Sequence, residues 1–542
     1  MKKVEFGDEK IPVSPMGRRA EARRCRKRFR GSHGDRFLFF ALKERYFPVM
    51  YIPSLDDSAV QTVTAHRRSV QNRACRALKR LSAATERFWL SRWYFPAMLL
   101  AAAACSFADQ EVIGVAVLAC LSAWFLALCP DFLACVCPFV MIFLLSGSEY
   151  TDISVFYPCV ILVLPLAMSL VLHLILWPVT FRVGRSGRGL ALVCLATLLG
   201  GCNVIRPEEY WSPLSLYYTL GLGVMLLAIY LLFRSYLRQE RSYDLGSRFA
   251  ALFTTLGLLM TAILLAEYAG RWQEFLNGGE LLFIWYRNFA ATVLLTMLPA
   301  SLYLALRHRL HLLSAAVMLM GMVLTGSRSA LLFGTVELML GCIYLVRYGA
   351  VSRRVMLAGA AVCAVGMALF GLPLLKTLYA GRMVGGELIR ADEVRWKILA
   401  RGIDDFLHHP MFGMGLGNRV NSDLFRGVKG SMFFYHNLLV QIMGSMGLLG
   451  LVAYARLIKD RISLLLRRRT PFTVAFAMCY LGMVMVSMTN PGEFCPLPNA
   501  GLMVMLFAVV EETVGDAAIP VTQALGLHRY NHRAKVMTFS QK

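Results

Sequence analysis

The 542-residue chain is apolar and strongly basic, with 57% hydrophobic residues and a formal net charge of +24. Soluble domains contain roughly 45–50% apolar residues, whereas here they come in runs of about 16–24, the length of a membrane-spanning helix. This composition excludes a soluble multidomain protein. The basic residues gather near the N-terminus and in short connectors, where they set membrane orientation, which argues against nucleic acid binding.

The first 92 residues are polar and basic and precede the first long apolar run. Residues 18–30 read RRAEARRCRKRFR, and further arginines follow from residue 67 to residue 92. We predict a cytoplasmic tail that fixes the orientation of the protein. A helix resting on anionic lipid is an alternative, favoured by the apolar cluster at residues 37–51.

About fourteen apolar runs follow, and they predict an all-α, polytopic membrane protein with about 12–14 transmembrane helices. With the N-terminus inside, every second connector is rich in Arg and Lys and the opposite ones are nearly free of them, which also predicts a cytoplasmic C-terminus. The predicted spans are 93–107, 112–128, 132–147, 156–177, 189–204, 214–233, 249–268, 288–306, 310–325, 329–346, 355–374, 437–457, 472–489 and 497–511.

One predicted extracytoplasmic connector, residues 375–436, is much longer than the others. Within it, DEVRWKILARGIDDFLHHP has apolar residues at three- and four-residue spacing and acidic residues at its start, with Pro410 at its end. The pattern predicts an amphipathic helix. Loops of this length in compact folds are usually functional or disordered, and the helix favours function.

Three polar segments fall on the predicted external face, and each holds one residue suited to phosphate chemistry: Arg328, Arg395 and His436. Each has an ordinary explanation alone, because Arg328 could snorkel to headgroups, Arg395 could be solvated and His436 could cap a helix. Together they predict a site for a lipid-linked phosphate, since Arg donates paired hydrogen bonds to phosphate and neutral His accepts a proton. The segments are TGSRSALL (325–332), the stretch ending in HHPMFGMGLGN (at 418) and HNLLVQIMGSMGLLG (436–450).

Other polar residues are weaker candidates. Glu337 lies within a predicted span, where an ionisable group is often functional, although it could be neutral or paired there. His173 is best explained as a helix contact. No Cys and His set has the spacing of a zinc site, and no acidic metal-binding motif is evident, so we predict neither a metal nor a cofactor.

The three segments, in this order, resemble the O-antigen ligase and O-antigen polymerase superfamily between about Leu310 and Leu457. The resemblance implies a metal-independent glycosyltransferase of the bacterial cytoplasmic (inner) membrane, acting at its outer face on undecaprenyl-pyrophosphate-linked glycans. It implies that Arg328 and Arg395 hold the donor pyrophosphate and that His436 activates the acceptor hydroxyl.

Four further residues are substrate-binding candidates on this interpretation. Leu399 stands where the family usually has Trp, so Arg390 is a second candidate for the loop arginine. Tyr435, Asn437 and Gln441 flank His436 and could orient it, contact sugar or cap the helix.

The resemblance also suggests an organisation of the chain and its partners. We expect a basic cytoplasmic tail (1–92), N-terminal transmembrane helices (93–309), a ligase/polymerase-like membrane domain (310–511) and a cytoplasmic C-terminal tail (512–542). The expected partners are the lipid-linked donor, a glycan, lipid-glycan or protein acceptor, and membrane lipids. Ligase, polymerase and protein O-glycosyltransferase activities all remain open. A secondary transporter or lipid-linked oligosaccharide flippase is the alternative.

Overall fold

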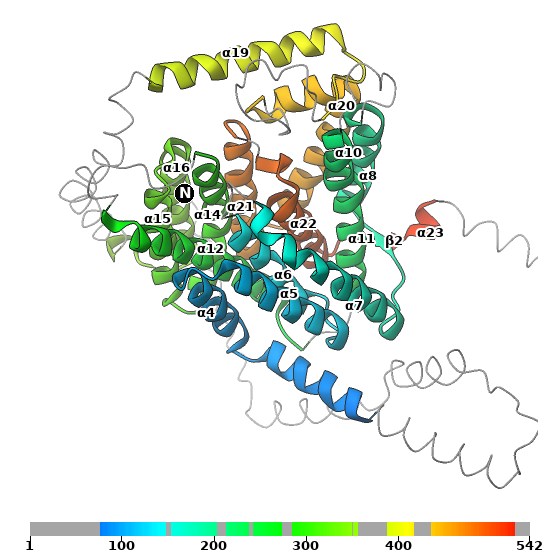
Figure 1. Cartoon of the computed structure of the whole chain (residues 1–542), viewed down its shortest axis with the longest axis vertical. Coiled ribbons are helices and arrows are strands. Elements are labelled where there is room, and N and C mark those ends of the chain that lie inside the picture. Colours follow the sequence, from blue (N-terminus) through cyan, green and yellow to red (C-terminus); the bar gives the residue numbers. More distant parts are fainter. Residues whose placement is uncertain are drawn as a thin grey trace, which may run out of the picture. The chain divides into compact units, whose positions relative to one another are not determined.

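The computed structural model describes residues 76–147, 153–202, 213–237, 242–273, 284–349, 351–355, 387–416, 435–490 and 492–525 (Figure 1). These residues are almost entirely helical; the strands among them are β1 (Arg182–Val183) and β2 (Ile519–Pro520), which pair antiparallel. The all-α fold of a polytopic membrane protein is therefore confirmed. Residues 76–79 and 171–178 belong to one compact unit, and the other described residues belong to a second, which contains the candidate site.

The N-terminal half of the described chain contains α4 (Tyr94–Phe107), α5 (Glu111–Leu128), α6 (Leu133–Ser146), η2 (Ile153–Leu162), α7 (Val163–Leu176), α8 (Arg185–Ala196), η3 (Thr197–Gly201), α10 (Pro213–Thr219), η4 (Leu220–Met225), α11 (Leu226–Tyr236) and α12 (Leu245–Gly270). The C-terminal half contains α14 (Ile284–Ala305), α15 (His311–Leu324), α16 (Arg328–Arg347), α19 (Glu387–His408), α20 (Leu438–Arg467), α21 (Pro471–Ser487), η7 (Gly492–Phe494), η8 (Pro496–Ala500), α22 (Gly501–Val514) and α23 (Val521–Ala524).

Each predicted span within the described residues coincides with helical structure, and the predicted span 355–374 lies outside them except for its first residue. Among the described residues, seven helices are long and apolar enough to cross a membrane, and five shorter apolar helices accompany them. The correspondence has a simple cause. A segment in lipid must satisfy its backbone groups internally, so a long apolar run becomes a helix.

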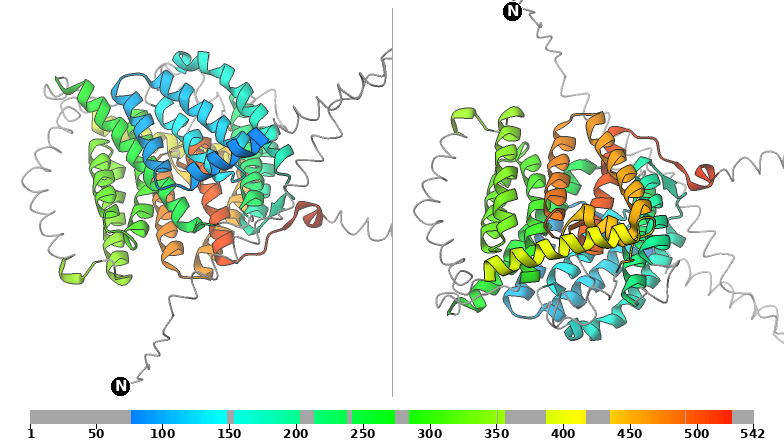
Figure 2. Two further views of the ribbon diagram at one scale, coloured as in Figure 1. Left: turned by 90° about the horizontal axis from the view of Figure 1, so that it is seen from below. Right: turned by 90° about the horizontal axis from the view of Figure 1, so that it is seen from above.

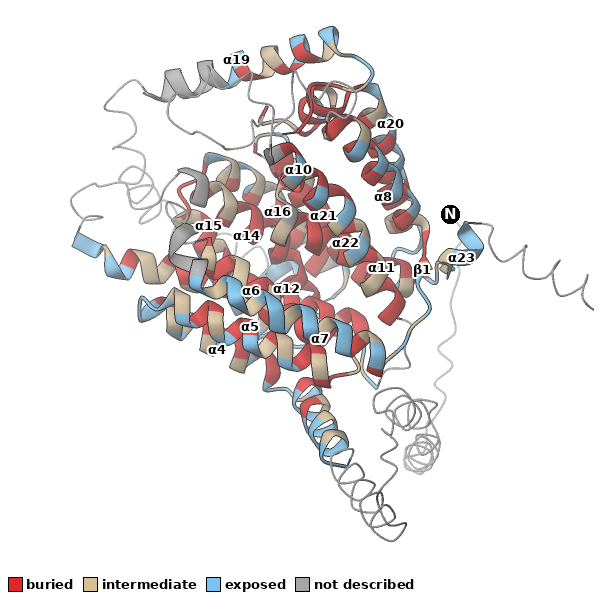
Figure 3. Ribbon diagram, turned by 45° about the vertical axis from the view of Figure 1, so that its right-hand side comes forward, coloured by how far each residue is buried: buried red, intermediate tan, exposed pale blue. Residues whose placement is uncertain are grey.

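Aromatic side chains fill the centre of the second unit. Phe249 and Phe253 of α12 lie with ring centroids 4.8 Å apart, and Phe472 and Phe476 of α21 lie 4.4 Å apart. Phe253 and Phe476 join the two helices edge to face at 5.6 Å. Figure 3 shows that buried residues line the facing sides of these helices.

Glycines allow close contacts between helices, as is common in membrane bundles. A Cβ on Gly189 of α8 would lie 2.8 Å from the Leu457 Cα of α20, and a Cβ on Gly257 of α12 would lie 2.3 Å from the Met318 side chain. The contact at Gly189 is with backbone, so α8 and α20 could not approach as closely with alanine there. At Gly257 the flexible end of the Met318 side chain would have to shift.

The predicted N-terminal tail ends earlier than residue 92. Residues 76–90 are helical, and Trp89 is buried, with its indole nitrogen donating to Asp131 at 3.2 Å. The Arg248 guanidinium of α12 stacks 4.3 Å above the Trp89 ring. The last residues of the basic segment are therefore part of the helical bundle. The predicted C-terminal tail likewise begins within α22 and includes β2.

The predicted amphipathic helix is present as α19 and begins at Glu387. It lies across the N-terminal end of α20 (Figures 1 and 2). Its buried Ile398 packs against Tyr435 and Val440, which precede and begin the next membrane helix. This contact brings the extramembrane helix to the start of α20.

Helix α20 is broken at Gly447, where φ is 61° and ψ is −151°. The segment after α19 fills the break: Leu448 N donates to the Pro410 carbonyl at 2.7 Å, and Met414 N donates to the Gly444 carbonyl at 2.7 Å. A Cβ on Gly413 would lie 2.5 Å from the α20 backbone. Residues 413–416, the described part of the GMGLGN segment, thus make the close backbone approach that glycines allow, and their partner is α20.

Candidate functional site

Tyr435 joins α19 to the start of α20. Its hydroxyl donates to Asp405 Oδ2 at 2.6 Å, and Arg401 Nε donates to the other oxygen of the same carboxylate at 3.2 Å. The Tyr435 ring fits between two glycines, because a Cβ on Gly402 or Gly444 would lie 2.6 or 2.8 Å from it. Tyr435 and Asp405 are each only 3% exposed, so this contact fixes where α19 sits.

Gln441 and Asn437 hold the first turn of α20. Buried Gln441 accepts from Tyr435 N at 2.9 Å and donates to Ser445 Oγ at 2.9 Å. Asn437 is the N-cap, and its Oδ1 accepts from two backbone N–H groups of the first turn, at 3.0 and 3.2 Å. Its Nδ2 donates to the Met488 carbonyl at 3.4 Å. The backbone on both sides of His436 is therefore fixed.

His436 itself has an unusual backbone, with φ of 55° in the left-handed region. Its ring is hydrogen-bonded to the Thr489 backbone, and its Nδ1 is buried with no hydrogen-bond partner among the described residues. In the neutral ring one of the two nitrogens carries a lone pair that can accept a proton.

Arg395 of α19 lies close enough to His436 to affect its ionisation. Burial of the ring and the nearby Arg395 charge lower the pKa of His436 to about 4, although the hydrogen bond to Thr489 opposes this shift. The Arg395 side chain is exposed, as is that of Trp396. Arg390 lies on the same helix, but its side chain is outside the described residues.

Arg328 is the first residue of α16 and its side chain is exposed. Next to it, Ser329 Oγ accepts from Asn490 Nδ2 at 3.3 Å, and Ser327 Oγ donates to Asn288 Oδ1 of α14 at 3.3 Å. Asn490 directly follows Thr489, whose backbone bonds the His436 ring.

The structure therefore brings the three sequence-predicted motifs to one end of the bundle. Arg395 and His436 interact electrostatically, and the Arg328 turn contacts the same end of α21 that contacts His436. This arrangement places two arginines and His436 at the same end of the bundle. Among the described residues, no group of three His, Cys, Asp or Glu side chains is placed to hold a metal ion.

Residues 313–455 match the family model described as O-Antigen ligase. This part of the chain is similar to the O-antigen ligase and polymerase superfamily. The match covers about a quarter of the chain and includes Arg328, Arg395 and His436. No curated protein matched the chain.

This O-antigen ligase domain does not include the end of α21, which the motif-based prediction also missed. Buried Asn490 has an Oδ1 atom without a partner among the described residues, beside the backbone that holds His436. Asn288 and buried Arg287, at the start of α14, adjoin the Arg328 turn and were also missed as site residues. One signal could have found Arg287, since it is one of the few arginines on the predicted external face.

Glu337 and His173 are not part of this arrangement. Glu337 lies nine residues after Arg328 on α16, fully buried against Gly482 of α21, and neither carboxylate oxygen has a partner among the described residues. His173 belongs to the other compact unit and packs against Trp177, with ring centroids 4.9 Å apart.

Proposed function

We propose that the protein transfers a glycan from undecaprenyl pyrophosphate to an acceptor hydroxyl at the outer face of the bacterial cytoplasmic membrane. The observation that carries this proposal is the position of Arg395 beside His436, at the end of the bundle where the Arg328 turn also lies. A diphosphate is the ligand that best fits two guanidinium groups, because each can donate paired, charge-assisted hydrogen bonds to it.

The donor binds with its prenyl chain among the helices and its pyrophosphate between Arg328 and Arg395. Arg390, five residues before Arg395 on α19, is the second candidate for the α19 contact. Both guanidinium groups remain charged at any relevant pH, so they stabilise the negative charge that develops on the leaving pyrophosphate. This step requires neither a metal nor a cofactor.

His436 is the general base. A nitrogen of its neutral ring takes the proton from the acceptor hydroxyl, whose oxygen attacks the anomeric carbon while the bond from that carbon to the pyrophosphate oxygen breaks. The electron pair of that bond leaves with prenyl pyrophosphate, and a single displacement inverts the anomeric carbon. With a pKa of about 4 the free histidine is a weak base, but the bound diphosphate offsets the Arg395 charge and raises its basicity.

The neighbouring polar residues divide into two groups. Tyr435 and Gln441 are buried and bonded within the protein, which suits positioning of His436 rather than direct contact with sugar. Asn437 is less buried, and Asn490 offers an acceptor atom beside His436, so these two are the candidates for contact with a substrate hydroxyl. The acceptor is a glycan, a lipid-glycan or a protein, and ligase, polymerase and protein O-glycosyltransferase activities share this mechanism.

Transfer by the full-length protein in liposomes containing a lipid-linked glycan donor tests the proposal. We expect His436→Ala to lower the rate by about 10²–10⁴-fold, the usual contribution of a general base, and Arg328→Gln to lower it by about 10²-fold or more. His408→Ala, at the exposed end of α19, and Arg347→Gln, at the far end of α16, are matched controls that retain activity. Full activity in correctly inserted His436→Ala protein would refute the assigned chemistry.

A flippase would also handle this donor, and the side on which donor accumulates distinguishes the two functions. A strain lacking the transferase accumulates the lipid-linked glycan at the outer face, whereas a strain lacking a flippase accumulates it at the inner face. The polar cluster at the end of the bundle, rather than at its midpoint, supports transfer.

A further inference from the structure

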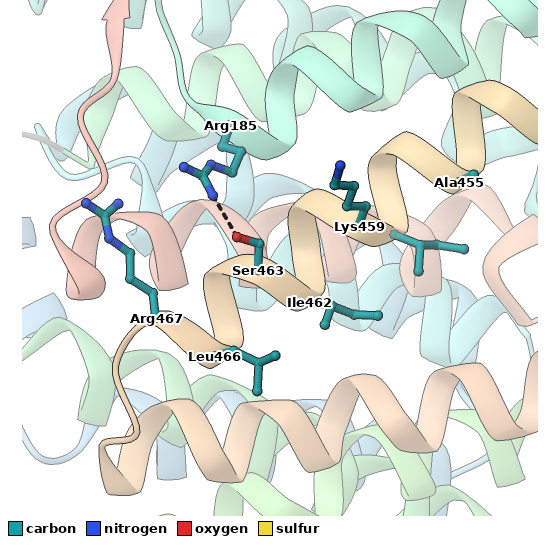
Figure 4. Close-up of a pocket in the computed structure, with 8 residues that line it drawn as sticks. Arg185, Ala455, Lys459, Ile462, Ser463, Leu466 and Arg467 are labelled. Carbon is teal, nitrogen blue, oxygen red and sulfur yellow. Dashed lines mark hydrogen bonds between the residues drawn. The ribbon is translucent and has the colours of Figure 1, made fainter.

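A groove of about 960 Å³ lies along the last turns of α20, at the other end of this helix from His436 (Figure 4). Most of its lining comes from one face of the helix, with the spacing i, i+3, i+4, i+7 and i+8 from Lys459. The first residue of α8 completes one side. The lining residues are Arg185, Ala455, Ile458, Lys459, Ile462, Ser463, Leu466 and Arg467.

The groove has a cationic side and an apolar side. Arg185 donates to Ser463 Oγ at 2.7 Å, Lys459 is exposed, and Arg467 pairs with Asp516. Figure 4 shows these three cationic groups along one side of α20. Within the described part of the chain, no acidic side chain pairs with Arg185 or Lys459, so the groove carries net positive charge.

The apolar side is formed by aliphatic residues of the same helix. Ile462 is 46% exposed and Leu466 is 60% exposed, and in Figure 4 both point away from the cationic groups. Ala455 and Ile458 continue this surface one turn towards the middle of the helix. A ligand that fits the groove therefore has an anionic group joined to hydrocarbon.

Lys459 differs from the two charged residues that follow it. Asp460 accepts from Arg456 at 2.8 Å, and Arg461 donates to Glu493 at 2.9 Å, so both are neutralised inside the protein. Arg467 lies 19 residues after Leu448, the first residue beyond the Gly447 break, or about 28 Å along a helix at 1.5 Å per residue. This length approaches a hydrocarbon core of roughly 30 Å, so the Arg467 end of the groove reaches the headgroup level of the leaflet opposite His436, and Lys459 lies about two turns before it on the same face.

We propose that this groove binds an anionic phospholipid of that leaflet. Arg185 and Lys459 hold its phosphate, and Arg467 lines the headgroup end. The acyl chains cover Ile458 and Ile462. Basic pockets between membrane helices bind anionic headgroups in this way, whereas a zwitterionic headgroup carries no net charge to complement the groove.

Native mass spectrometry of the full-length protein in a non-ionic detergent tests the proposal. Dioleoyl phosphatidylglycerol and dioleoyl phosphatidylcholine are added separately, and the affinity of the first bound lipid is measured. We expect a preference for phosphatidylglycerol, and a loss of about fivefold in its affinity for each cation removed, in Lys459→Gln and in Arg185→Gln/Lys459→Gln. If the double variant does not fold, the lipid affinity of Lys459→Gln alone tests the proposal.

The matched control is Arg468→Gln/Arg469→Gln, which removes the same charge from exposed residues just beyond the groove. It should retain the wild-type affinity. Water-soluble glycerol phosphate should not displace the lipid at equal concentration, because it cannot cover Ile462. Equal affinity for the two lipids, an equal loss in the control, or displacement by glycerol phosphate would each overturn the proposal.

Discussion

The conformation of His436 is strained. A non-glycine residue with φ near 55° costs of order 1–3 kcal/mol and persists only where its surroundings hold it. Here the Asn437 cap and the bonds to Tyr435 fix the backbone on both sides. Such strain is common at functional sites.

The low pKa of His436 predicts the pH dependence of transfer. Burial and Arg395 depress the pKa to about 4, so the free enzyme carries the neutral base above that pH and loses it as the pH falls through 4. We expect kcat/KM to retain its value down to about pH 5 and to fall below it. The acid limb of kcat should lie at higher pH, because the bound diphosphate favours the protonated histidine. An acid limb of kcat/KM near 6.5 would contradict this prediction.

Arg395→Gln separates the two causes of the low pKa. Removing the charge leaves burial as the depressing cause, so the acid limb of kcat/KM should move to higher pH while the rate falls. The same measurement on Lys397→Gln, which removes a charge from an exposed position on the same helix, should leave the limb in place.

Tyr435→Phe tests whether Arg395 affects His436 only when α19 is docked on the start of α20. The lost hydrogen bond to buried Asp405 weakens the docking of α19 by about 1.5–3 kcal/mol. We expect a rate loss of about tenfold and an acid limb shifted in the same direction as in Arg395→Gln. A role confined to overall stability would lower the amount of folded protein and leave the limb unchanged.

At the scale of elements, the break in α20 fixes the position of the HHPMFGMG segment, which follows α19, against the α20 backbone. Gly447→Ala should destabilise the protein, because its Cβ would lie 2.6 Å from the Met411 carbonyl carbon and from the Pro410 oxygen, at a φ of 61°. Gly349→Ala is the matched control, since Gly349 has a φ of 75° with open space around it. The control measures the cost of a positive φ at an open position, about 1–2 kcal/mol. Gly447→Ala adds the clash, about 1–3 kcal/mol, and the cost of a ψ of −151°, which at this φ is almost restricted to glycine. Thermal unfolding in detergent measures the difference, and equal shifts would exclude the clash.

The membrane helices and α19 were predictable from the sequence because apolar runs and three- and four-residue spacing are local signals. The break at Gly447 was not, since SMGLLG also suits a continuous helix. The break depends on the hydrogen bond that the Pro410 carbonyl accepts and the one that Met414 N donates, and both residues are distant in sequence. Tertiary contacts also stabilise the irregular segment between α21 and α22, where Glu493 pairs with Arg461.

The residues of the candidate site also divide into those that the sequence could predict and those that it could not. Arg328, Arg395 and His436 could be predicted because charged and ionisable side chains stand out in a largely apolar sequence. Asn490 could not, because an asparagine after an apolar run usually ends a helix. Its importance comes from the packing of α21 against α16 and α20, which no local pattern specifies.

Across the second unit, contacts sort the helix ends into two sets. Ends predicted to be external contact one another, and ends predicted to be internal do the same, as alternating membrane spans require. The external contacts include Tyr268 with Leu324, Gly201 with Leu416, and Asn490 with Ser329. The internal contacts include Arg307 with Asp244, Arg467 with Asp516, and Arg234 with Glu511 and Glu512.

The proposed orientation of the protein in the membrane rests on the basic residues near the helix ends predicted to be internal. Cysteine labelling tests this orientation. His408 on α19 and Arg468 at the end of α20 are both exposed and lie on opposite predicted faces. In spheroplasts treated with a membrane-impermeant maleimide, we expect the His408→Cys variant to be labelled at once. The Arg468→Cys variant should be labelled only after lysis.

The parent chain sets the background for this experiment, because it already contains 14 cysteines. The buried cysteines, which include Cys137 and Cys479, contribute little labelling, since burial in apolar surroundings keeps the thiol protonated and unreactive. The unsubstituted parent, labelled in parallel, accounts for the others, among them the exposed Cys120. The reverse pattern would place His436 and both arginines on the cytoplasmic side. The donor would then be used before it crosses the membrane, and the proposed role for the site would fail even if each residue proved essential.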